Sequence, residues 1–390
     1  MTTANREHLR SRLRALGFGV VRFASAADVP AGRFSEWLEA GHHAGMEWIA
    51  RGREKRLDPN AIVEGTRSVV CLGVNYLPAG EAAAQQRWSK YALNEDYHET
   101  IGAALREAGR ILERDHGLAR EDYRAYVDTG PVLERGWAAR AGLGWQGKNG
   151  MLISREHGNW LFLSVILTRL DVPPDPPLPA LAEEPGQQVG HYCGSCTRCL
   201  AACPTDAFPE PGLIDARRCI AYHTIENRGI IPRELRARFG GRVFGCDTCL
   251  DVCPWNKFAR ASRSTLVIAR EAIAGLTLTD LLTMSEERFR EVFRKTPIKR
   301  SKLAGLLRNA CIAAGNWDDT DDWHFGGVTR EGVVAAVLAL CVHGSPIVRA
   351  HAVWAARRLL RSEESDTLAD LRRQENDPVV KEEYDHGGSG

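Results

Sequence analysis

Residues 193–204 read Cys193-Gly-Ser-Cys196-Thr-Arg-Cys199-Leu-Ala-Ala-Cys203-Pro204. Their spacing is C-x2-C-x2-C-x3-C-P, and the ending C-x2-C-x3-C-P returns at residues 246–254 with Cys246, Cys249 and Cys253. One more cysteine, Cys219, stands between the two runs. Eight of the eleven cysteines in this 390-residue chain therefore fall between residues 193 and 253.

This spacing is that of bacterial two-cluster ferredoxins, and it has a physical basis. Three thiolates on one tight loop reach three irons of a cubane, whereas the fourth lies on a following helical turn and faces the other cluster. The sequence therefore predicts two [4Fe-4S] clusters. By exchange of the last cysteine, cluster one takes Cys193, Cys196, Cys199 and Cys253, and cluster two takes Cys203, Cys219, Cys246 and Cys249.

Structural zinc is the alternative, because two C-x2-C pairs could form a ribbon-like site with four thiolate ligands. Zinc leaves four cysteines and both C-x3-C-P endings without a role, so the pattern favours iron and sulfur. Three further cysteines, Cys71, Cys311 and Cys341, fall in apolar segments. We expect them to be small core residues rather than ligands.

The segment before the cysteines alternates helical and strand patterns. Strands are predicted at 18–23, 68–76, 123–127 and 160–170, and helices at 6–16, 101–115 and 132–141. These elements predict an α/β domain over residues 1–178. Between residues 171 and 190 six prolines exclude a helix interior or a central strand and predict a linker or wrapping segment. A ferredoxin-like domain is expected over residues 179–260.

After residue 260 the pattern becomes almost purely helical. Ser345-Pro346-Ile-Val-Arg recurs 32 residues later as Asp377-Pro378-Val-Val-Lys, and in each copy a capping side chain precedes proline at the first helical position. The recurrence predicts an all-α, HEAT-like module over residues 261–390, although the period is short for HEAT repeats. Two unrelated helix starts are the alternative.

The charge balance excludes some classes of partner. Lys and Arg number 51 against 50 Asp and Glu, so the net charge of +1 gives no general attraction to nucleic acid or membrane. A local polyanion site is predicted at 294–308, which holds six basic residues and no acid. A solvated helix face is the alternative there. Without a signal peptide or a long apolar segment, we expect a soluble, cytoplasmic protein with reduced thiols and no membrane contact.

Two motifs point to a cofactor site. Residues 142–149 fit G-x-G-x-x-G and G-x-x-x-x-G-K, but they follow a predicted helix and Asn149 replaces the required Ser or Thr, so a nucleotide loop is excluded. Close approach to another large cofactor stays open. Asp128 follows a predicted strand, where ligands of α/β domains bind. It is a candidate general acid if burial raises its pKa, and the alternative is a turn or helix cap.

Taken together, several segments resemble the epoxyqueuosine reductases of bacterial tRNA modification. They cover nearly the whole chain: EKRLDP at 54–59, KYALNEDYH at 90–98, VDTGPVLERGWAARAGLGWQGKNGMLIS at 127–154, the eight cysteines, CIAYHTIENRG at 219–229, GCDTCLDVCPWN at 245–256 and PIKRSKLAGLLRNACIAAGN at 297–316. The resemblance implies that the N-terminal domain binds cobalamin. It also implies two-electron reduction of epoxyqueuosine to queuosine at the tRNA wobble position, with electrons from a small donor such as a flavodoxin or ferredoxin.

The same resemblance implies roles for single residues. Asp128 falls on the proton-donor position, and Arg56, Tyr97, Asp128, Lys148, Asn149 and Leu152 would line the cobalamin. Ala221 stands where the family usually has Ser, which leaves only a backbone contact there. Contacts with the anticodon stem-loop of tRNA would come from Arg228, Lys299, Arg300 and Arg308. We expect the protein to be a monomer.

Two other functions stay open on the sequence. A corrinoid reductive dehalogenase also combines cobalamin with two such clusters, but an exported member would carry a twin-arginine signal, which this chain lacks. A noncatalytic electron-transfer or RNA-binding iron–sulfur protein is the second alternative. The large domain before the clusters and the position of Asp128 argue against it.

Overall fold

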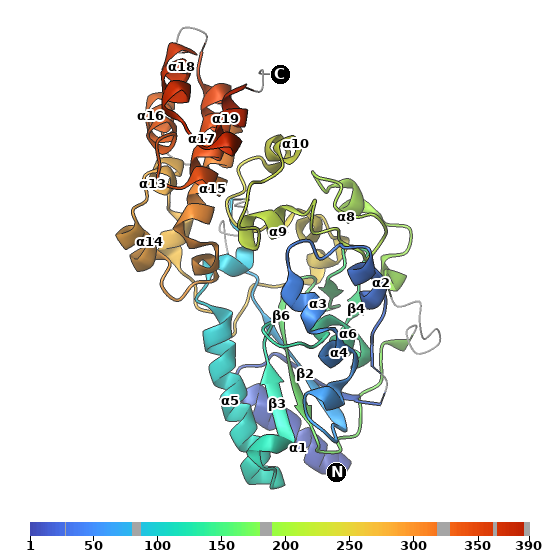
Figure 1. Cartoon of the computed structure of the whole chain (residues 1–390). Coiled ribbons are helices and arrows are strands. Elements are labelled where there is room, and N and C mark those ends of the chain that lie inside the picture. The colour runs from blue at the N-terminus through green and yellow to red at the C-terminus, as the bar shows by residue number, and fades with distance from the viewer. Residues whose placement is uncertain (28, 80–86, 180–188, 318–327, 362–364, 386–390) are drawn as a thin grey trace. The chain divides into compact units, whose positions relative to one another are not determined.

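The chain divides into two compact units in the computed structural model, which describes residues 1–27, 29–79, 87–179, 189–317, 328–361 and 365–385 (Figure 1). The first unit comprises 1–83, 94–217 and 248–269, and the second 84–93, 218–247 and 270–390. This division differs from the three consecutive domains predicted with boundaries at 178 and 260. The cysteine region is shared between the units because compactness depends on contacts, whereas a sequence boundary marks only a change in composition.

The first unit is built on a four-stranded sheet in the order β1-β2-β6-β3. Its strands are β1 (Val20–Ser25), β2 (Ser68–Asn75), β6 (Leu161–Thr168) and β3 (Tyr123–Tyr126). Every neighbouring pair is antiparallel. The four predicted strands are confirmed, but the α/β prediction, which implies parallel strands, is wrong for this sheet. Apolar strands buried on both faces look alike in sequence whichever way their neighbours run.

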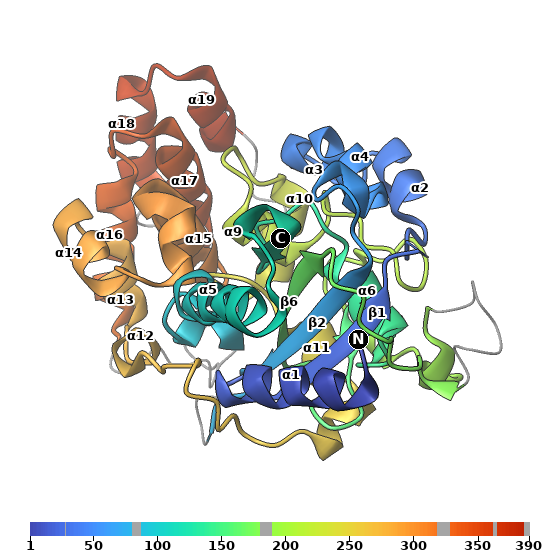
Figure 2. The ribbon, with the colours of Figure 1, turned by 90° about the horizontal axis from the view of Figure 1, so that it is seen from below.

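Helices cover both faces of this sheet. On one face α6 (Glu134–Arg140) packs against β1, β2 and β6, and Trp137 meets Cys71 and Val165 in one core cluster. The alternate residues of β2, such as Val70, are also buried. In addition, α1 (Thr3–Ala15) packs against β1 (Figure 2), and α5 (Tyr97–His116) packs against β3 (Figure 1). Cys71 is therefore a core residue, as predicted.

Shorter elements complete the first unit. They are α2 (Phe34–Glu39), α3 (Glu47–Arg51), α4 (Arg53–Leu57), η1 (Pro59–Ala61), η4 (Arg120–Asp122), β4 (Trp145–Gln146), β5 (Leu152–Ile153), η5 (His191–Cys193), α8 (Arg198–Ala201), α11 (Thr248–Asp251) and η7 (Pro254–Phe258). The two short helices that carry cysteines, α8 and α11, pack against each other. This pairing brings the first cysteine run and the end of the second together.

The start of α5 is fixed by a cap. The Asp96 side chain accepts a hydrogen bond from the backbone N–H of His98, which satisfies a donor of the first turn. The helix ends at Gly117, which takes the left-handed conformation with φ 67°. Tyr97 and His98 therefore stand at the beginning of the helix in a defined orientation.

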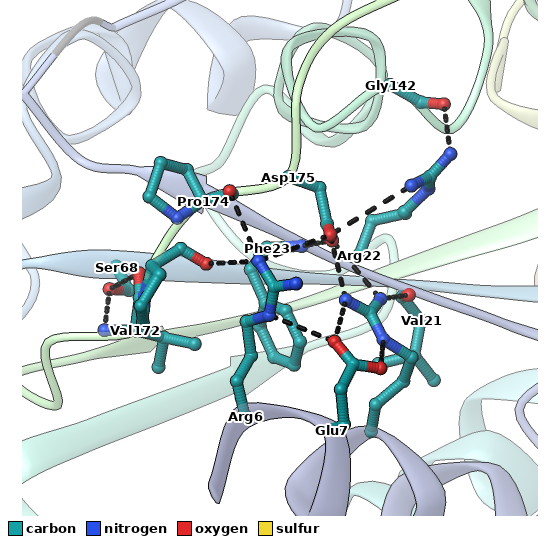
Figure 3. A network of polar contacts seen from close by, with 12 residues as sticks. Arg6, Glu7, Val21, Arg22, Phe23, Ser68, Gly142, Val172, Pro174 and Asp175 are labelled. Carbon is teal, nitrogen blue, oxygen red and sulfur yellow. Dashed lines mark hydrogen bonds and ion pairs between the residues drawn. The ribbon is translucent and has the colours of Figure 1, made fainter. Parts of the chain in front are cut away.

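The proline-rich segment wraps onto the first unit through Asp175. Its buried carboxylate accepts hydrogen bonds from both terminal nitrogens of Arg10, at 3.1 and 2.8 Å, and from the backbone N–H of Phe23 at 2.9 Å. Figure 3 shows Asp175 at the centre of this network, with Arg6, Glu7 and Arg22 around it. The prediction of a wrapping segment is confirmed for the described residues; Pro185 lies outside them.

Replacing Asp175 with alanine is expected to lower the free energy of unfolding by about 3–5 kcal/mol, because it removes the buried counter-charge of Arg10, leaves only the half-exposed Glu7 to pair with that guanidinium, and leaves the Phe23 N–H without its acceptor. Urea unfolding followed by circular dichroism measures the change. Asp171→Ala is the matched control, since the Asp171 side chain is 71% exposed and meets Arg67 only at 3.9 Å. Equal stability of the two variants would contradict a structural role for the Asp175 network.

The second unit consists mainly of helices in its described residues. They are η3 (Lys90–Leu93), α9 (Ile220–Ile225), α10 (Arg233–Arg236), η6 (Ala237–Phe239), α12 (Glu271–Ala274), α13 (Leu278–Leu282), α14 (Glu286–Val292), η8 (Pro297–Ser301), α15 (Lys302–Gly315), α16 (Arg330–Leu340), α17 (Pro346–Leu359), α18 (Ser365–Gln374) and α19 (Pro378–Asp385).

The all-helical prediction is confirmed for this C-terminal part. Helix α17 packs against α15, α16 and α19 (Figure 1). Both predicted helix starts are also confirmed, because α17 begins at Pro346 and α19 at Pro378. Cys311 and Cys341 are buried in this unit, as predicted. Among the described helices, none is long and apolar enough to cross a bilayer.

Candidate active site

Asp128 lies on a tight loop between β3 and α6. Its backbone is left-handed, with φ 59°, a conformation that aspartate and asparagine tolerate better than most residues. Gly130 follows, and a Cβ atom there would lie 2.3 Å from Cγ of Tyr126, so the loop needs glycine. Sequence and backbone together therefore place the Asp128 carboxylate at the tip of a constrained turn.

The Asp128 side chain contacts the beginning of α5. The Tyr97 hydroxyl donates to Asp128 Oδ2 at 2.6 Å, and His98 Nε2 lies 3.5 Å from the same oxygen. The Asp128 side chain is 64% exposed. The general-acid prediction is conditional on burial of this carboxyl group, and the structure does not bury it. The prediction that Tyr97 and Asp128 belong to one site is consistent with their contact.

His98 was not singled out from the sequence. Its Nδ1 lies 2.7 Å from Asp96 Oδ1, so the ring is held between two carboxylates. Burial opposes protonation of His98, but the contact with Asp96 and the ion pair with Asp128 outweigh it and raise the pKa to about 9. His98 is therefore a cation at neutral pH. Its position directly after Tyr97 was the one available sequence signal.

A second carboxyl group follows in the first turn of α6. Burial raises the pKa of Glu134 to about 7, and the charge of Asp128 adds to this rise. Its Oε1 atom is shielded from solvent and has no hydrogen-bond partner among the described residues. Arg56 and Arg135 are the nearby cations that oppose the rise. Arg56 itself is buried, and it lies over the Trp48 ring at 5.7 Å.

Four thiols line one cavity in the first unit. The cavity has a volume of about 160 Å³, and its walls include Cys193, Cys196, Cys199 and Cys253. Cys253 comes from the second run and the other three from the first. The structure therefore brings together the four cysteines that ligand exchange assigned to cluster one.

The arrangement of these thiols bears on the choice between zinc and a cluster. Burial raises the pKa of Cys199 to about 11, and the neighbouring Cys193, Cys253 and Cys196 thiols add to the rise. A cubane requires thiolates spread around a cavity, and these four thiols line the walls of one, so they fit a [4Fe-4S] cluster.

Hydrogen bonds between three asparagine side chains stabilise the wall of this cavity. The Asn149 amide donates to Asn159 Oδ1 at 2.8 Å, and the Asn159 amide donates to Asn256 Oδ1 at 3.0 Å. A hydrogen bond from Asn159 also counteracts the rise in the pKa of Cys253 that burial causes. Such bonds to ligand sulfur tune cluster potentials. The role of Asn159 was missed from the sequence, since a single asparagine before a strand carries no distinctive pattern.

The second set of cysteines is divided between the units. Cys203 and Cys249 belong to the first unit, whereas Cys219 and Cys246 belong to the second. The Cys203 sulfur accepts a hydrogen bond from the backbone N–H of Ala207 at 3.3 Å, as ligand sulfurs commonly do. The assignment of these four residues to cluster two stays a prediction that rests on their spacing.

The residues predicted to line cobalamin take different positions. Tyr97 and Asp128 touch, and Arg56 lies near Glu134. Lys148 and Asn149 line the cavity of the four thiols, where Lys148 Nζ donates to the Gly194 carbonyl at 2.6 Å. Leu152 is buried in β5, and Ala221 lies on α9 of the second unit.

Within the first unit, the residues around the Asp128 loop fit a large cofactor. The solvent-shielded Glu134 oxygen lacks a partner among the described residues, and the exposed Tyr97–Asp128 pair offers polar atoms to a ligand. The Asn149 side-chain amide already donates to Asn159 Oδ1 and to the Cys249 carbonyl.

Three predicted RNA contacts lie together in the second unit. Arg228, Lys299 and Arg300 are exposed, and η8, which carries two of them, packs against α9. The Arg300 guanidinium is held by Glu226 at 2.8 and 2.9 Å, and Arg228 donates to the Ser301 carbonyl at 3.3 Å. These three side chains form the surface that we call the basic edge.

Arg308 is an exception, and the prediction that it meets RNA is corrected. Its side chain is 1% exposed, and its guanidinium donates to the carbonyls of His223, Asn227 and Gly229. Burial, with the charge of Arg228, lowers its pKa. The basic run looked uniform in sequence, but Arg308 lies on the inward face of α15 and anchors the loop that carries Arg228.

Comparison with known proteins gives a consistent result. Residues 56–129 match the family model described as epoxyqueuosine reductase QueG, DUF1730, and residues 192–256 match the 4Fe-4S double cluster binding domain. The epoxyqueuosine reductase of Gloeobacter violaceus is 42% identical over 80% of this chain and 96% of its own length. That of Pseudomonas aeruginosa is 37% identical over 88% and 92%.

Solved structures agree. A crystal structure of an epoxyqueuosine reductase with an epoxyqueuosine-modified tRNA-Tyr stem loop has a TM-score of 0.83 and 26% identity, covering 98% of this chain and 97% of that one. A Bacillus subtilis epoxyqueuosine reductase, whose catalytic aspartate loop is swung out of the active site, has a TM-score of 0.76 and 25% identity, with 98% and 97% covered. From the cysteine runs, the loop aspartate and these relatives it follows that this chain belongs to the epoxyqueuosine reductase family.

Proposed function

We propose that this protein reduces epoxyqueuosine in tRNA to queuosine, the last step in making that nucleoside. The observation that carries the proposal is the 42% identity to an epoxyqueuosine reductase over 96% of that relative's length. The relative solved with a modified stem loop supports the same substrate. These relationships favour a tRNA reductase over the reductive dehalogenase and the noncatalytic electron-transfer protein.

The eight clustered cysteines are the proposed ligands of two [4Fe-4S] clusters, and Arg56, Tyr97, Lys148, Asn149, Leu152 and Ala221 are proposed to hold cobalamin. These groups, when bound, would supply the electron path and the reducing centre. The four-thiol cavity supports the first cluster. A small flavodoxin or ferredoxin is the proposed electron donor.

Asp128 is the proposed proton donor. It lies on a loop, as does the catalytic aspartate that is named for the Bacillus subtilis relative. The Tyr97 hydroxyl, 2.6 Å away, orients the carboxylate. Because the epoxide oxygen gains negative charge as its carbon bonds break, a proton delivered there at the right moment lowers the barrier.

The basic edge is the proposed contact for the anticodon stem-loop. Glu226 holds Arg300 in place before binding, so less side-chain entropy is lost when a phosphate arrives. A wobble base must leave the stack to reach a reducing centre, which suits a single-stranded loop. Since tRNA is the substrate, we place the reaction in the cytoplasm, with the protein acting as a monomer and its C-terminal helices as a HEAT-like support.

Replacing Arg300 with alanine is expected to weaken binding of a modified anticodon stem-loop about threefold to tenfold and to reduce the salt-dependence slope by about one. Fluorescence anisotropy at several salt concentrations measures both. Arg290→Ala is the matched control, because Arg290 is 74% exposed and pairs with Glu286 on α14, outside the basic edge. If both variants lose affinity equally, the contact is not local to the basic edge.

The proposed activity is tested with protein purified under anaerobic conditions. The full chain, loaded with iron, sulfide and cobalamin and supplied with a low-potential reductant, is incubated with epoxyqueuosine-containing tRNA. Mass spectrometry of the digested nucleosides is expected to show loss of one oxygen atom and formation of queuosine. Loaded protein that leaves the epoxide intact while reducing an aryl halide would instead support the dehalogenase.

A further inference from the structure

The first turn of α5 and the Asp128 loop form a short line of ionisable groups. Asp96 Oδ1 lies 2.7 Å from His98 Nδ1, and His98 Nε2 lies 3.5 Å from Asp128 Oδ2. Asp96 thus fixes the proton on Nδ1 and turns Nε2 toward Asp128. The proposed function gives roles to Asp128 and Tyr97 but leaves His98 unused.

The chemistry needs more protons than one carboxyl group can hold. Reduction of an epoxide to an alkene takes two electrons and two protons, because the oxygen leaves as water. Asp128 carries at most one proton, and it contacts His98, which is a cation at neutral pH. His98 is therefore a candidate source for the protons that Asp128 passes on.

We propose that His98 is the proton reservoir of this site and that its Nε2–H supplies, through Asp128, the protons taken up by the departing oxygen. The inference rests on the proposed function. His98 acts through Asp128 and not on the substrate, so it is a positioning and relay residue. The sequence motif KYALNEDYH contains it, but only the fold places it against the loop.

Each transfer breaks the Nε2–H bond of His98 and forms an O–H bond on Asp128, while Asp128 gives a proton to the substrate oxygen. Proton transfer from His98 to Asp128 is unfavourable by itself, because the pKa of His98 is about 9 and that of an ordinary aspartic acid is about 4. An alkoxide is a much stronger base than either group, so the two halves proceed together. Because His98 has a single Nε2–H, solvent returns a proton to it after each transfer, by way of the exposed Asp128 carboxyl group. Two electrons from the donor and two such transfers then break both C–O bonds, form the double bond and release water.

The charged groups that act on His98 are Asp128 from the loop and Asp96 from the helix cap. Glu134 is the competing reservoir, since its carboxyl group is buried near Asp128 with a pKa of about 7. The two sources predict different pH profiles. A relay through His98 keeps turnover up to about pH 9 and loses it as pH rises further, whereas a relay through Glu134 loses it near neutrality.

One test needs no turnover. Nitrogen-15 NMR of the full chain, with His98→Gln used to assign the signal, follows the imidazole through a pH titration without cobalamin. We expect His98 to titrate near pH 9 in the native chain, and lower in both Asp128→Asn and Asp96→Asn. An unchanged midpoint in Asp128→Asn would overturn the proposed coupling.

The second test uses turnover on modified tRNA. His98→Ala is expected to lower the turnover number about 10-fold to 100-fold with KM unchanged, to remove the alkaline limb and to be rescued by added imidazole. His8→Ala, on the exposed face of α1, is the matched control. Iron content and absorption spectra confirm that the variants fold.

The outcomes separate the two proposals. If the native chain does not reduce epoxyqueuosine, the proposed function falls, and this inference falls with it. If the native chain is active and His98→Ala keeps both its rate and its alkaline limb, the inference alone is overturned. It is also overturned if Glu134→Gln, rather than His98→Ala, changes the pH profile.

Discussion

Replacing Asp128 with asparagine is expected to reduce turnover on epoxyqueuosine-modified tRNA by about 100-fold or more, because asparagine cannot transfer a proton to the leaving oxygen. Asparagine is the sharpest substitution here. It tolerates the left-handed backbone at φ 59°, and its oxygen still accepts the hydrogen bond from Tyr97. Loss of activity can then be assigned to the proton. Single-turnover assays with pre-reduced protein measure the effect directly.

Asp128→Ala provides the comparison for the asparagine variant. It removes the same proton, but it also removes the Tyr97 contact and adds backbone strain of about 1 kcal/mol. We expect both variants to bind cobalamin and iron like the native chain. Only Asp128→Ala should have a lower melting temperature. Native turnover in Asp128→Asn would remove Asp128 from the mechanism.

Replacing Cys253 with alanine is expected to lower the iron content from about eight to about four atoms per chain and to abolish turnover, because one cubane loses a ligand. Alanine is preferred to serine, whose oxygen can still bind iron. Iron analysis and electron paramagnetic resonance of the reduced protein measure the result. Cys71→Ala is the matched control, since Cys71 is 1% exposed in the core of the sheet. This variant should keep the full iron content of the native chain.

The grouping of ligands can be tested with the same variants. Because Cys253 lines a cavity with Cys193, Cys196 and Cys199, the Cys253→Ala and Cys193→Ala variants should leave the same residual spectrum. Cys203→Ala and Cys249→Ala should share the other spectrum. If Cys253→Ala instead matches Cys249→Ala, each cysteine run binds its own cluster and the ligand exchange is wrong.

Several features were predicted from sequence because they depend on local spacing. The cysteine intervals indicated two clusters and an exchange of ligands, and the four-thiol cavity is consistent with that exchange. The strands were found from apolar runs, and the starts of α17 and α19 from proline at the first helical position. Each of these signals lies within a few residues, so the chain carries it whatever the rest of the fold does.

Other features depend on contacts between distant segments. The antiparallel order of β2 and β6 joins residues about 90 apart, and no local pattern records the direction of pairing. Arg308 reads as one more surface cation until α15 turns it inward. Asp128, which lies 30 positions further along the chain, helps to raise the pKa of His98 and so to keep its ring charged.

By itself, the sequence determined that this chain holds thiolates in a two-cluster pattern and belongs among the epoxyqueuosine reductases, because ligand spacing and family motifs are properties of the unfolded chain. The tertiary structure alone decided which side chains face one another. It set Asp128 between Tyr97 and His98, left Glu134 Oε1 shielded and enclosed Arg308. Proton affinity depends on burial and on charges within a few ångströms, and those distances exist only once the chain has folded.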